Sequence, residues 1–159
     1  MIGGMKYALP CLVAACSWLP ADSPPKKPVR PDRDLAELAN TWTVENHVLA
    51  GNATISDSDA RENHGRTVDI TPGTYKSFTV GSCEESARQK TDRVFADLLV
   101  ELDLAGDARD TAIHFGFGDP VTEYRLTCPG NPKALPLVMY VSGKRAMTCF
   151  GGVCYLLAR

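Results

Sequence analysis

The stretch that decides the fold class is residues 146–158, which read AMTCFGGVCYLLA. Two short apolar segments flank Gly151 and Gly152, and a Gly-Gly pair in this setting is a strong signal for the two-residue turn of a β-hairpin. In such a hairpin Phe150 lies opposite Val153 as the hydrogen-bonded pair next to the turn. We therefore expect two antiparallel strands in this part of the chain.

The residues before this hairpin contain further segments that alternate between apolar and polar side chains, as half-buried strands do. They lie at 42–48, 67–71, 78–80, 112–117 and 123–127, and residues 137–141 are continuously apolar. A short helix is expected at 57–64, where Ser56 supplies an N-cap, and a longer one at 92–104, where apolar residues recur at helical spacing. The sequence thus predicts a mainly β fold: an antiparallel barrel or sandwich of about eight strands with one short and one longer helix.

The first residues have the pattern of an export signal, with Lys6 followed by an apolar stretch from Tyr7 to Ala15. This stretch is too short to span a bilayer, which takes about 20 apolar residues, and Pro10 interrupts it. An ordinary signal peptide cut near Ala15 or after Ala21 would leave a soluble periplasmic protein. That alternative stays open.

Val13-Ala14-Ala15-Cys16 resembles the lipobox of bacterial lipoprotein precursors. The resemblance implies that residues 1–15 are removed and that Cys16 is acylated, with palmitate among the expected chains. Several acyl chains would hold the protein stably on the lipid bilayer. Ser17 stands where lipoproteins kept in the inner membrane tend to carry Asp, so the resemblance implies the periplasmic face of the outer membrane.

The composition divides the remaining chain into a linker and one domain. Residues 16–33 hold five of the eleven prolines and show no apolar periodicity, which is typical of an extended tether. From residue 34 the composition changes to that of a folded chain, and the remaining length suits one core rather than two. We expect a single β-rich periplasmic domain over residues 34–159.

With Cys11 in the leader and Cys16 assigned to lipid, four cysteines remain for the domain. An even number in an oxidising compartment predicts two disulfide bonds, and four cysteines permit three connectivities. In the predicted hairpin Cys149 and Cys154 face each other at a non-hydrogen-bonded position, where Cα atoms lie about 4.5 Å apart and a disulfide can form. We therefore prefer Cys149 with Cys154, which leaves Cys83 with Cys128.

The sequence contains no recognisable catalytic motif, and we expect neither an enzyme nor a cofactor. No C-x-x-C pair supports a zinc site, and no metal is expected. The three histidines appear scattered, with His47 on the predicted outer face of a strand, His64 at a helix end and His114 in a Gly-rich strand. The 17 basic and 19 acidic residues give a formal net charge of −2, which provides no electrostatic support for nucleic-acid binding.

A helical turn, a first strand that begins at Trp42, further strands and an amphipathic helix together resemble the lipocalin-like small β-barrels. The resemblance implies a closing arginine, which the sequence does not identify. We expect a non-catalytic envelope protein that binds a protein partner, with an inhibitor or immunity-type role; the alternative is a carrier of a small apolar ligand. Five residues are expected to face the interior, as core or as ligand contacts: Trp42, Phe115, Phe117, Tyr124 and Met139.

Overall fold

The computed structural model describes residues 38–159, so the leader 1–15, the linker 16–33 and the expected start of the domain at residue 34 lie outside the described residues. The C-terminal hairpin forms as the sequence predicts, from β8 (Arg145–Phe150) and β9 (Val153–Ala158). Both turn glycines have left-handed backbone angles, with φ of 61° at Gly151 and 79° at Gly152. Gly152 is also required for space, because a Cβ there would lie 2.5 Å from the Cα of Ala53.

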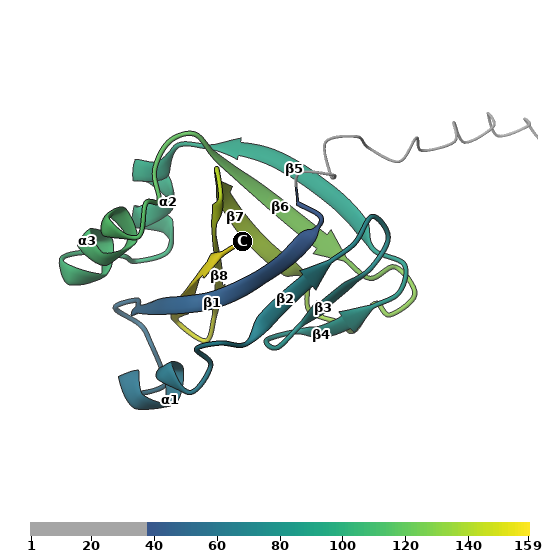
Figure 1. Ribbon diagram of the computed structural model, residues 1–159, viewed down its shortest axis with the longest axis horizontal. Helices are drawn as coiled ribbons and strands as arrows, with labels where there is room; N and C mark the ends of the chain where they lie inside the picture. The colour runs from purple at the N-terminus through teal and green to yellow at the C-terminus, as the bar shows by residue number, and fades with distance from the viewer. Residues whose placement is uncertain (1–37) are drawn as a thin grey trace, which may run out of the picture. The chain divides into compact units, whose positions relative to one another are not determined.

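Within residues 38–159, nine antiparallel strands form one sheet that curls into a half-barrel, which confirms the predicted mainly β class (Figure 1). The strands lie in the order β4-β3-β2-β1-β9-β8-β7-β6-β5. The strands other than the hairpin are β1 (Asn40–Leu49), β2 (Thr67–Ile70), β3 (Tyr75–Ser77), β4 (Gly81–Cys83), β5 (Ala87–Arg93), β6 (Val121–Thr127) and β7 (Leu137–Ser142).

The two edge strands of the sheet, β4 and β5, follow each other directly in the chain. The connection between them is tied to the β2–β3 turn, because the Ser86 backbone N–H donates to the Gly73 carbonyl at 2.8 Å and the Arg88 guanidinium donates to the Thr71 carbonyl. These contacts bring the two open edges of the half-barrel together at one end.

The described residues contain three helices, α1 (Asp57–Arg61), α2 (Phe95–Glu101) and α3 (Asp107–His114). Helices α2 and α3 lie together at one end of the sheet, and α1 lies beyond the end of β1 (Figure 1). The N-cap of α1 is the expected one, since Ser56 Oγ accepts a hydrogen bond from the Asp59 backbone N–H. No helix in the described part of the chain has both the length and the apolar character needed to cross a bilayer.

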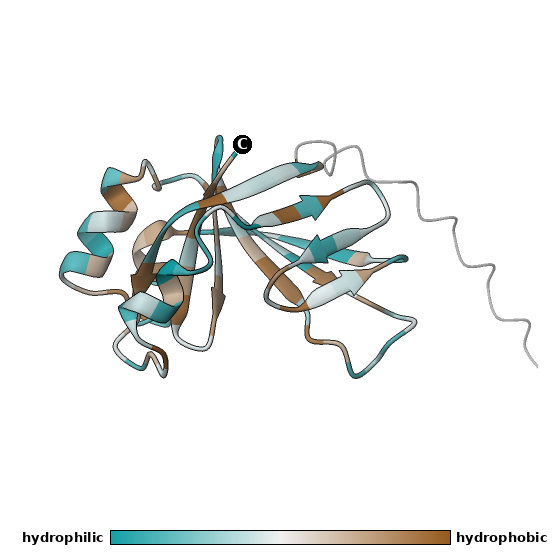
Figure 2. Ribbon diagram, turned by 60° about the horizontal axis from the view of Figure 1, so that its bottom comes forward, coloured by the Kyte–Doolittle hydropathy of each residue, from teal (hydrophilic) through white to brown (hydrophobic). Residues whose placement is uncertain are grey.

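Two apolar clusters make up the core, one inside the curl of the sheet and one that combines residues of the central strands with residues of α2 and α3. Strand β9 contributes to both, since Val153 and Tyr155 belong to the inner cluster while Cys154 and Leu156 belong to the other. Burial on both faces explains why this strand is apolar at consecutive positions. In β2, by contrast, half-buried polar and buried apolar residues alternate, and Figure 2 shows hydrophobic and hydrophilic residues side by side within the sheet.

Three sequence predictions of local structure are wrong. The strand expected at 112–117 is the end of α3 and the loop after it, because Ala108, Ala112 and Phe115 pack on the second cluster at helical spacing. The helix expected at 92–104 begins only at Phe95, after β5, whose mostly exposed side chains give no alternating pattern. The strand that returns after the first hairpin turn is β3 rather than 78–80.

Candidate functional site

The structure contains both disulfide bonds that the sequence predicts, Cys83–Cys128 and Cys149–Cys154. Their Cα atoms are 5.7 Å and 4.0 Å apart, respectively. The second bond joins directly opposite residues of the β8–β9 hairpin and so fixes its tip. The first joins β4 to the residue after β6, close to the place where the sheet edges meet.

The five residues expected to face one interior are divided between the two clusters. Trp42, Tyr124 and Met139 are buried in the inner cluster, where they pack as core. Phe117 is buried in the cluster beside α2 and α3, and Phe115 is partly buried against that cluster. The expectation of a common interior is therefore wrong for Phe115 and Phe117, because they follow a helix and not a strand.

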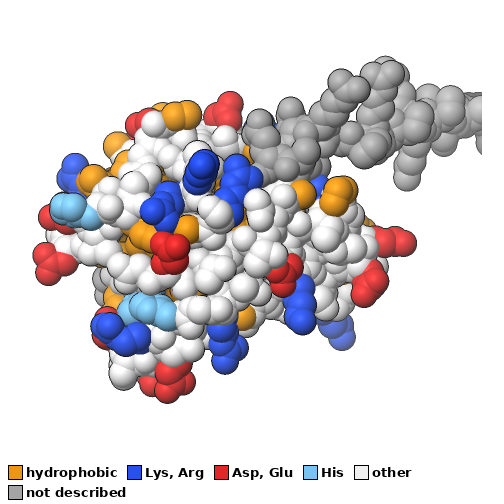
Figure 3. Space-filling view, viewed as in Figure 1, with side chains coloured by type: hydrophobic (Ala, Val, Ile, Leu, Met, Phe, Trp, Pro, Cys, Tyr) orange, Lys and Arg blue, Asp and Glu red, His pale blue; other side chains and the backbone are white. Residues whose placement is uncertain are grey.

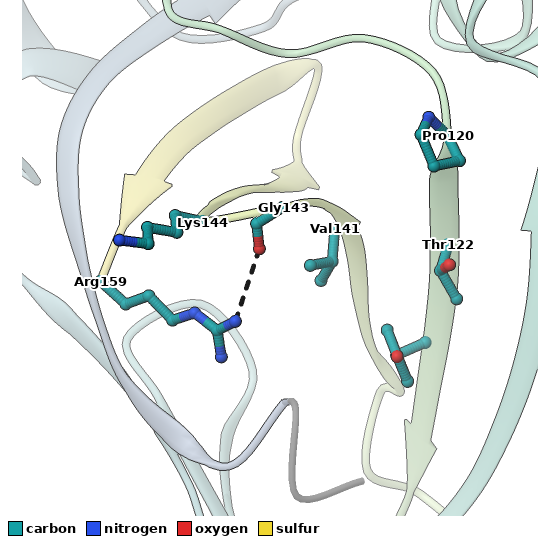
Figure 4. A pocket seen from close by; sticks show the side chains of 7 residues that line it. Pro120, Thr122, Val141, Gly143, Lys144 and Arg159 are labelled. Atoms are coloured by element: carbon teal, nitrogen blue, oxygen red, sulfur yellow. Dashed lines mark hydrogen bonds between the residues drawn. The ribbon is translucent and has the colours of Figure 1, made fainter. Parts of the chain in front are cut away.

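A hollow of about 470 Å³ lies between the ends of β6, β7 and β9 (Figure 4). Tyr124 is the one member of the expected five that lines it, together with apolar contacts such as Val141 and with the cationic side chains of Lys144 and Arg159. The Arg159 guanidinium donates to the Gly143 carbonyl at 3.5 Å and lies 4.8 Å from the centre of the Trp42 ring. This cation–π contact places the guanidinium of the C-terminal residue over a ring of the inner cluster.

A β-bulge in β1 decides where His47 points. The register of β1 against β9 shifts between Val44 and Asn46. Alternation that starts at Trp42 and Val44 would place His47 on the outer face, but the extra residue turns it to the inner face, where it lies opposite Tyr155. The predicted outward orientation of His47 is therefore wrong.

On the inner face His47 joins a hydrogen-bonded chain that reaches α1. Its side chain is 3% exposed, its Nδ1 lies 2.8 Å from Nε2 of His64, and its Nε2 lies 3.0 Å from Oδ1 of Asp57. The other carboxylate oxygen of Asp57 accepts a hydrogen bond of 2.9 Å from Arg61. We call these four residues the histidine cluster. Histidine is visible at the surface between β1 and α1, next to basic side chains (Figure 3).

The electrostatics of the histidine cluster favour a neutral His64 ring beside a charged Asp57 carboxylate. Burial lowers the pKa of His64 below its ordinary value of 6.5, and the charges of His47 and Arg61 lower it further. The hydrogen bond from Arg61 is the main cause that lowers the pKa of Asp57 below 3.8. At neutral pH the Asp57 carboxylate is therefore ionised and His64 is neutral.

The hydrogen bonds of the histidine cluster join two rings, a carboxylate and a guanidinium, so the cluster can hold a proton between its members. Both ring nitrogens of His47 are engaged, one by His64 and one by Asp57, so neither is left to activate a nucleophile. No group of three or more His, Cys, Asp or Glu side chains within residues 38–159 is arranged to hold a metal ion. The third histidine, His114, lies on α3 and contacts its own helix at the Asp110 carbonyl.

The sequence contains one signal that could have revealed this cluster. Without a bulge, the inward positions of β1 after Val44 would be Asn46 and Val48, and a polar Asn46 would then face the core. A polar residue at an inward position indicates a break in the alternation. The proximity of His47 to His64 has no signal of its own, because it depends on how α1 folds back onto β1.

A second feature is the tip of the β8–β9 hairpin. Phe150 is 46% exposed there, beside a small hollow of about 190 Å³ that Glu101 and Leu102 also line at the end of α2. Val100, the residue before them, is 82% exposed. We call Phe150 and the Cys149–Cys154 disulfide, together with the neighbouring Leu102 at the end of α2, the hairpin tip.

Comparison of the chain with protein-family models, with curated proteins and with solved structures finds no match.

Proposed function

We propose that this chain is a lipid-anchored, non-catalytic protein of the bacterial cell envelope, and that its domain binds a protein partner through the hairpin tip. The observation that carries the proposal is the exposed ring of Phe150 on a hairpin that a disulfide closes. Aromatic side chains held on a rigid element lose little conformational entropy on binding and are enriched at the centres of protein interfaces. An inhibitor or immunity-type role fits such a rigid contact.

The packing of the inner cluster also supports a surface function. Trp42 and Met139 are fully buried, and Tyr124 is 2% exposed, so these side chains fill the inside of the sheet. A carrier of large apolar molecules needs an open interior instead.

The contribution of Phe150 to partner binding is tested with one variant at this position and one control variant elsewhere. A photo-crosslinking amino acid at position 150 in living cells should give one discrete adduct with an envelope protein, which is then purified. We expect Phe150→Asp to weaken binding to that protein by about tenfold or more, because each tenfold corresponds to about 1.4 kcal/mol and a central aromatic side chain contributes at least that much. Lys76→Asp, at an exposed site on β3, is the control and should bind like the unmodified protein. Equal affinities for the unmodified protein and Phe150→Asp would contradict the proposal.

The anchor is tested separately. We expect Cys16→Ser to move the protein from the membrane fraction to the soluble periplasmic fraction and to abolish labelling by palmitate, because the acyl chains supply the membrane affinity. Cys11→Ser is the matched control and should stay in membranes. A Cys16→Ser variant that still fractionates with membranes would refute the lipobox interpretation.

The hollow between β6, β7 and β9 favours a second candidate function, the carriage of a small ligand. Its volume of about 470 Å³ lies within the usual range for small-molecule sites, and Lys144 and Arg159 suit an apolar molecule with an acidic group. Native mass spectrometry of the purified domain should then show a retained ligand, which Val141→Trp displaces by filling the hollow. A ligand-free mass in both samples would remove this candidate.

A further inference from the structure

We propose that residues 52–64 form a pH-sensitive latch, which the histidine cluster holds on β1 and which opens when both His47 and His64 carry a proton. The proposal rests on the direct contact between two imidazole nitrogens. A contact of 2.8 Å between Nδ1 of His47 and Nε2 of His64 needs one nitrogen to donate and the other to accept.

Three protonation states of the pair follow from this geometry. With both rings neutral, His64 donates to His47, and His47 donates its Nε2–H to Asp57. With one added proton, the charge is shared by the two rings and both hydrogen bonds persist. With a second added proton, both facing nitrogens carry hydrogen, so neither can accept. The contact between the rings then turns from a hydrogen bond into a repulsion between two cations.

The surrounding charges do not compensate for a second cation. From α1, Asp57 faces His47, but its carboxylate is shared with Arg61, and the guanidinium adds a third positive charge nearby. From β9, Tyr155 lies opposite His47, and its hydroxyl accepts a hydrogen bond of 2.9 Å from Asn63. Within the described residues, one carboxylate therefore faces up to three cations at low pH.

The pH range follows from the direction of the pKa shifts. The closed latch depresses the pKa of His64 below 6.5, so the open form takes up the proton more readily. The stability of the closed form is then complete above pH 6.5 and declines as the pH falls through that value. The pKa of Asp57 is lowered as well, so its contribution is lost only at more acidic pH, below 3.8. The two effects are therefore separated on the pH scale.

Backbone hydrogen bonds hold both ends of the latch in place, whereas the residues between them can detach from β1. At its start the Ala50 backbone N–H donates to the Gly152 carbonyl, and at its end Gly65 and Arg66 exchange backbone hydrogen bonds with Val44. Between these points the latch covers the inner cluster with the fully buried Ala60. Opening would uncover this end of the core without unpairing β1 from β9.

The latch also touches the β8–β9 turn, because the Thr54 backbone N–H and hydroxyl both donate to the Gly151 carbonyl. Opening would remove this support from the hairpin tip. A pH dependence of partner binding follows from this contact, and that consequence alone rests on the proposed function. The latch can be tested on the isolated protein without any partner.

Hydrogen–deuterium exchange between pH 7.5 and pH 5.0, corrected for the intrinsic pH dependence of exchange, measures the latch directly. We expect protection in peptides from 52–64 to fall by about tenfold per pH unit below the ordinary histidine pKa, while β6 and β7 stay protected. In His64→Gln the amide oxygen can accept from a protonated His47, so protection should persist. His114→Gln is the matched control and should behave like the unmodified protein.

Titration of the histidine ring signals by NMR gives a second readout that does not depend on any variant. We expect the His64 ring to titrate below its ordinary pKa of 6.5, with the latch amides changing in the same step. Constant protection of 52–64 down to pH 5.0, or equal loss in the unmodified protein and His64→Gln, would overturn the proposal. A His64 ring that titrates at its ordinary pKa of 6.5 would also overturn it.

Discussion

At the scale of single residues, the domain places a few ionisable side chains where water cannot fully solvate them. Tyr140 on β7 is 6% exposed and lies beside Glu123, which is 8% exposed and pairs with Arg93 at 2.8 Å. Burial, followed by the charge of Glu123, raises the pKa of Tyr140 to about 12. The pKa of the Tyr140 hydroxyl therefore reports on the charge of the neighbouring Glu123.

We expect one tyrosine to ionise near pH 12 in absorbance titrations of the folded protein at the phenolate band, and Tyr140→Phe to remove that step. Glu123→Gln should lower the pKa of Tyr140, because a neutral amide does not repel the phenolate. The raised pKa also predicts that stability is complete below pH 10 and is lost as the pH rises from 10 through 12. A titration that is unchanged by Tyr140→Phe would contradict the assignment.

At the scale of elements, Gly152 in the β8–β9 turn is needed for two reasons, its left-handed backbone and its close packing against another segment. Gly151 and Gly152 both have left-handed φ, but the space around them differs. A Cβ on Gly152 would meet the backbone of Ala53 at 2.5 Å, whereas a Cβ on Gly151 would have Thr54 Oγ1 as its nearest neighbour at 3.9 Å. The turn is thus packed against the start of the latch on one side and open on the other.

This difference predicts unequal costs for two matched substitutions. Gly151→Ala should lower the free energy of unfolding by about 1 kcal/mol, the cost of a left-handed conformation for a residue with a Cβ. Gly152→Ala should cost about 2 kcal/mol or more, because the backbone of Ala53 must also move. Urea unfolding of the two variants provides the comparison, and a larger loss for Gly151→Ala would show that this packing is wrong.

At the scale of the whole molecule, the two disulfide bonds close loops of very different length. Cys83 and Cys128 are separated by 45 residues, whereas Cys149 and Cys154 are separated by 5. In the chain-entropy description, the longer loop removes more freedom from the unfolded chain. The Cys83–Cys128 bond therefore stabilises the closure of the sheet, and the Cys149–Cys154 bond serves mainly to hold the hairpin tip in shape.

We expect the double substitution of Cys83 and Cys128 by Ala to lower the free energy of unfolding by about 4 kcal/mol, and that of Cys149 and Cys154 by about 2 kcal/mol. Thermal unfolding followed by circular dichroism measures both against the oxidised protein. Equal losses, or a greater loss for the hairpin variant, would show that loop length does not govern the stability of this fold.

The sequence predicts the parts of this fold that are encoded locally. The Gly151-Gly152 turn, the cap at Ser56 and the alternation of Trp42 and Val44 at the start of β1 each depend on neighbouring residues, and the structure has all three. The Cys149–Cys154 pairing follows from the turn in the same way.

The parts that the sequence does not predict depend on contacts between distant segments. The polar strand β5 is a strand because it pairs with β6, and its own side chains carry no alternating pattern. The bulge in β1 appears only in its register against β9, a strand from the far end of the described chain, and it turns His47 inward. The histidine cluster therefore forms no sequence motif, because its residues come together only through the bulge and the fold of α1 onto β1.

The pairing of β1 with β9 places strands from opposite ends of the domain side by side at the centre of the sheet. A chain that emerges from a ribosome or a translocation channel with its N-terminus first must therefore wait for β9 before this centre can form. Such non-local pairing makes folding slow, and until then β1 exposes one unpaired edge to other chains. The time that passes before β9 becomes available to β1 therefore sets how long this edge is open to pairing with other chains.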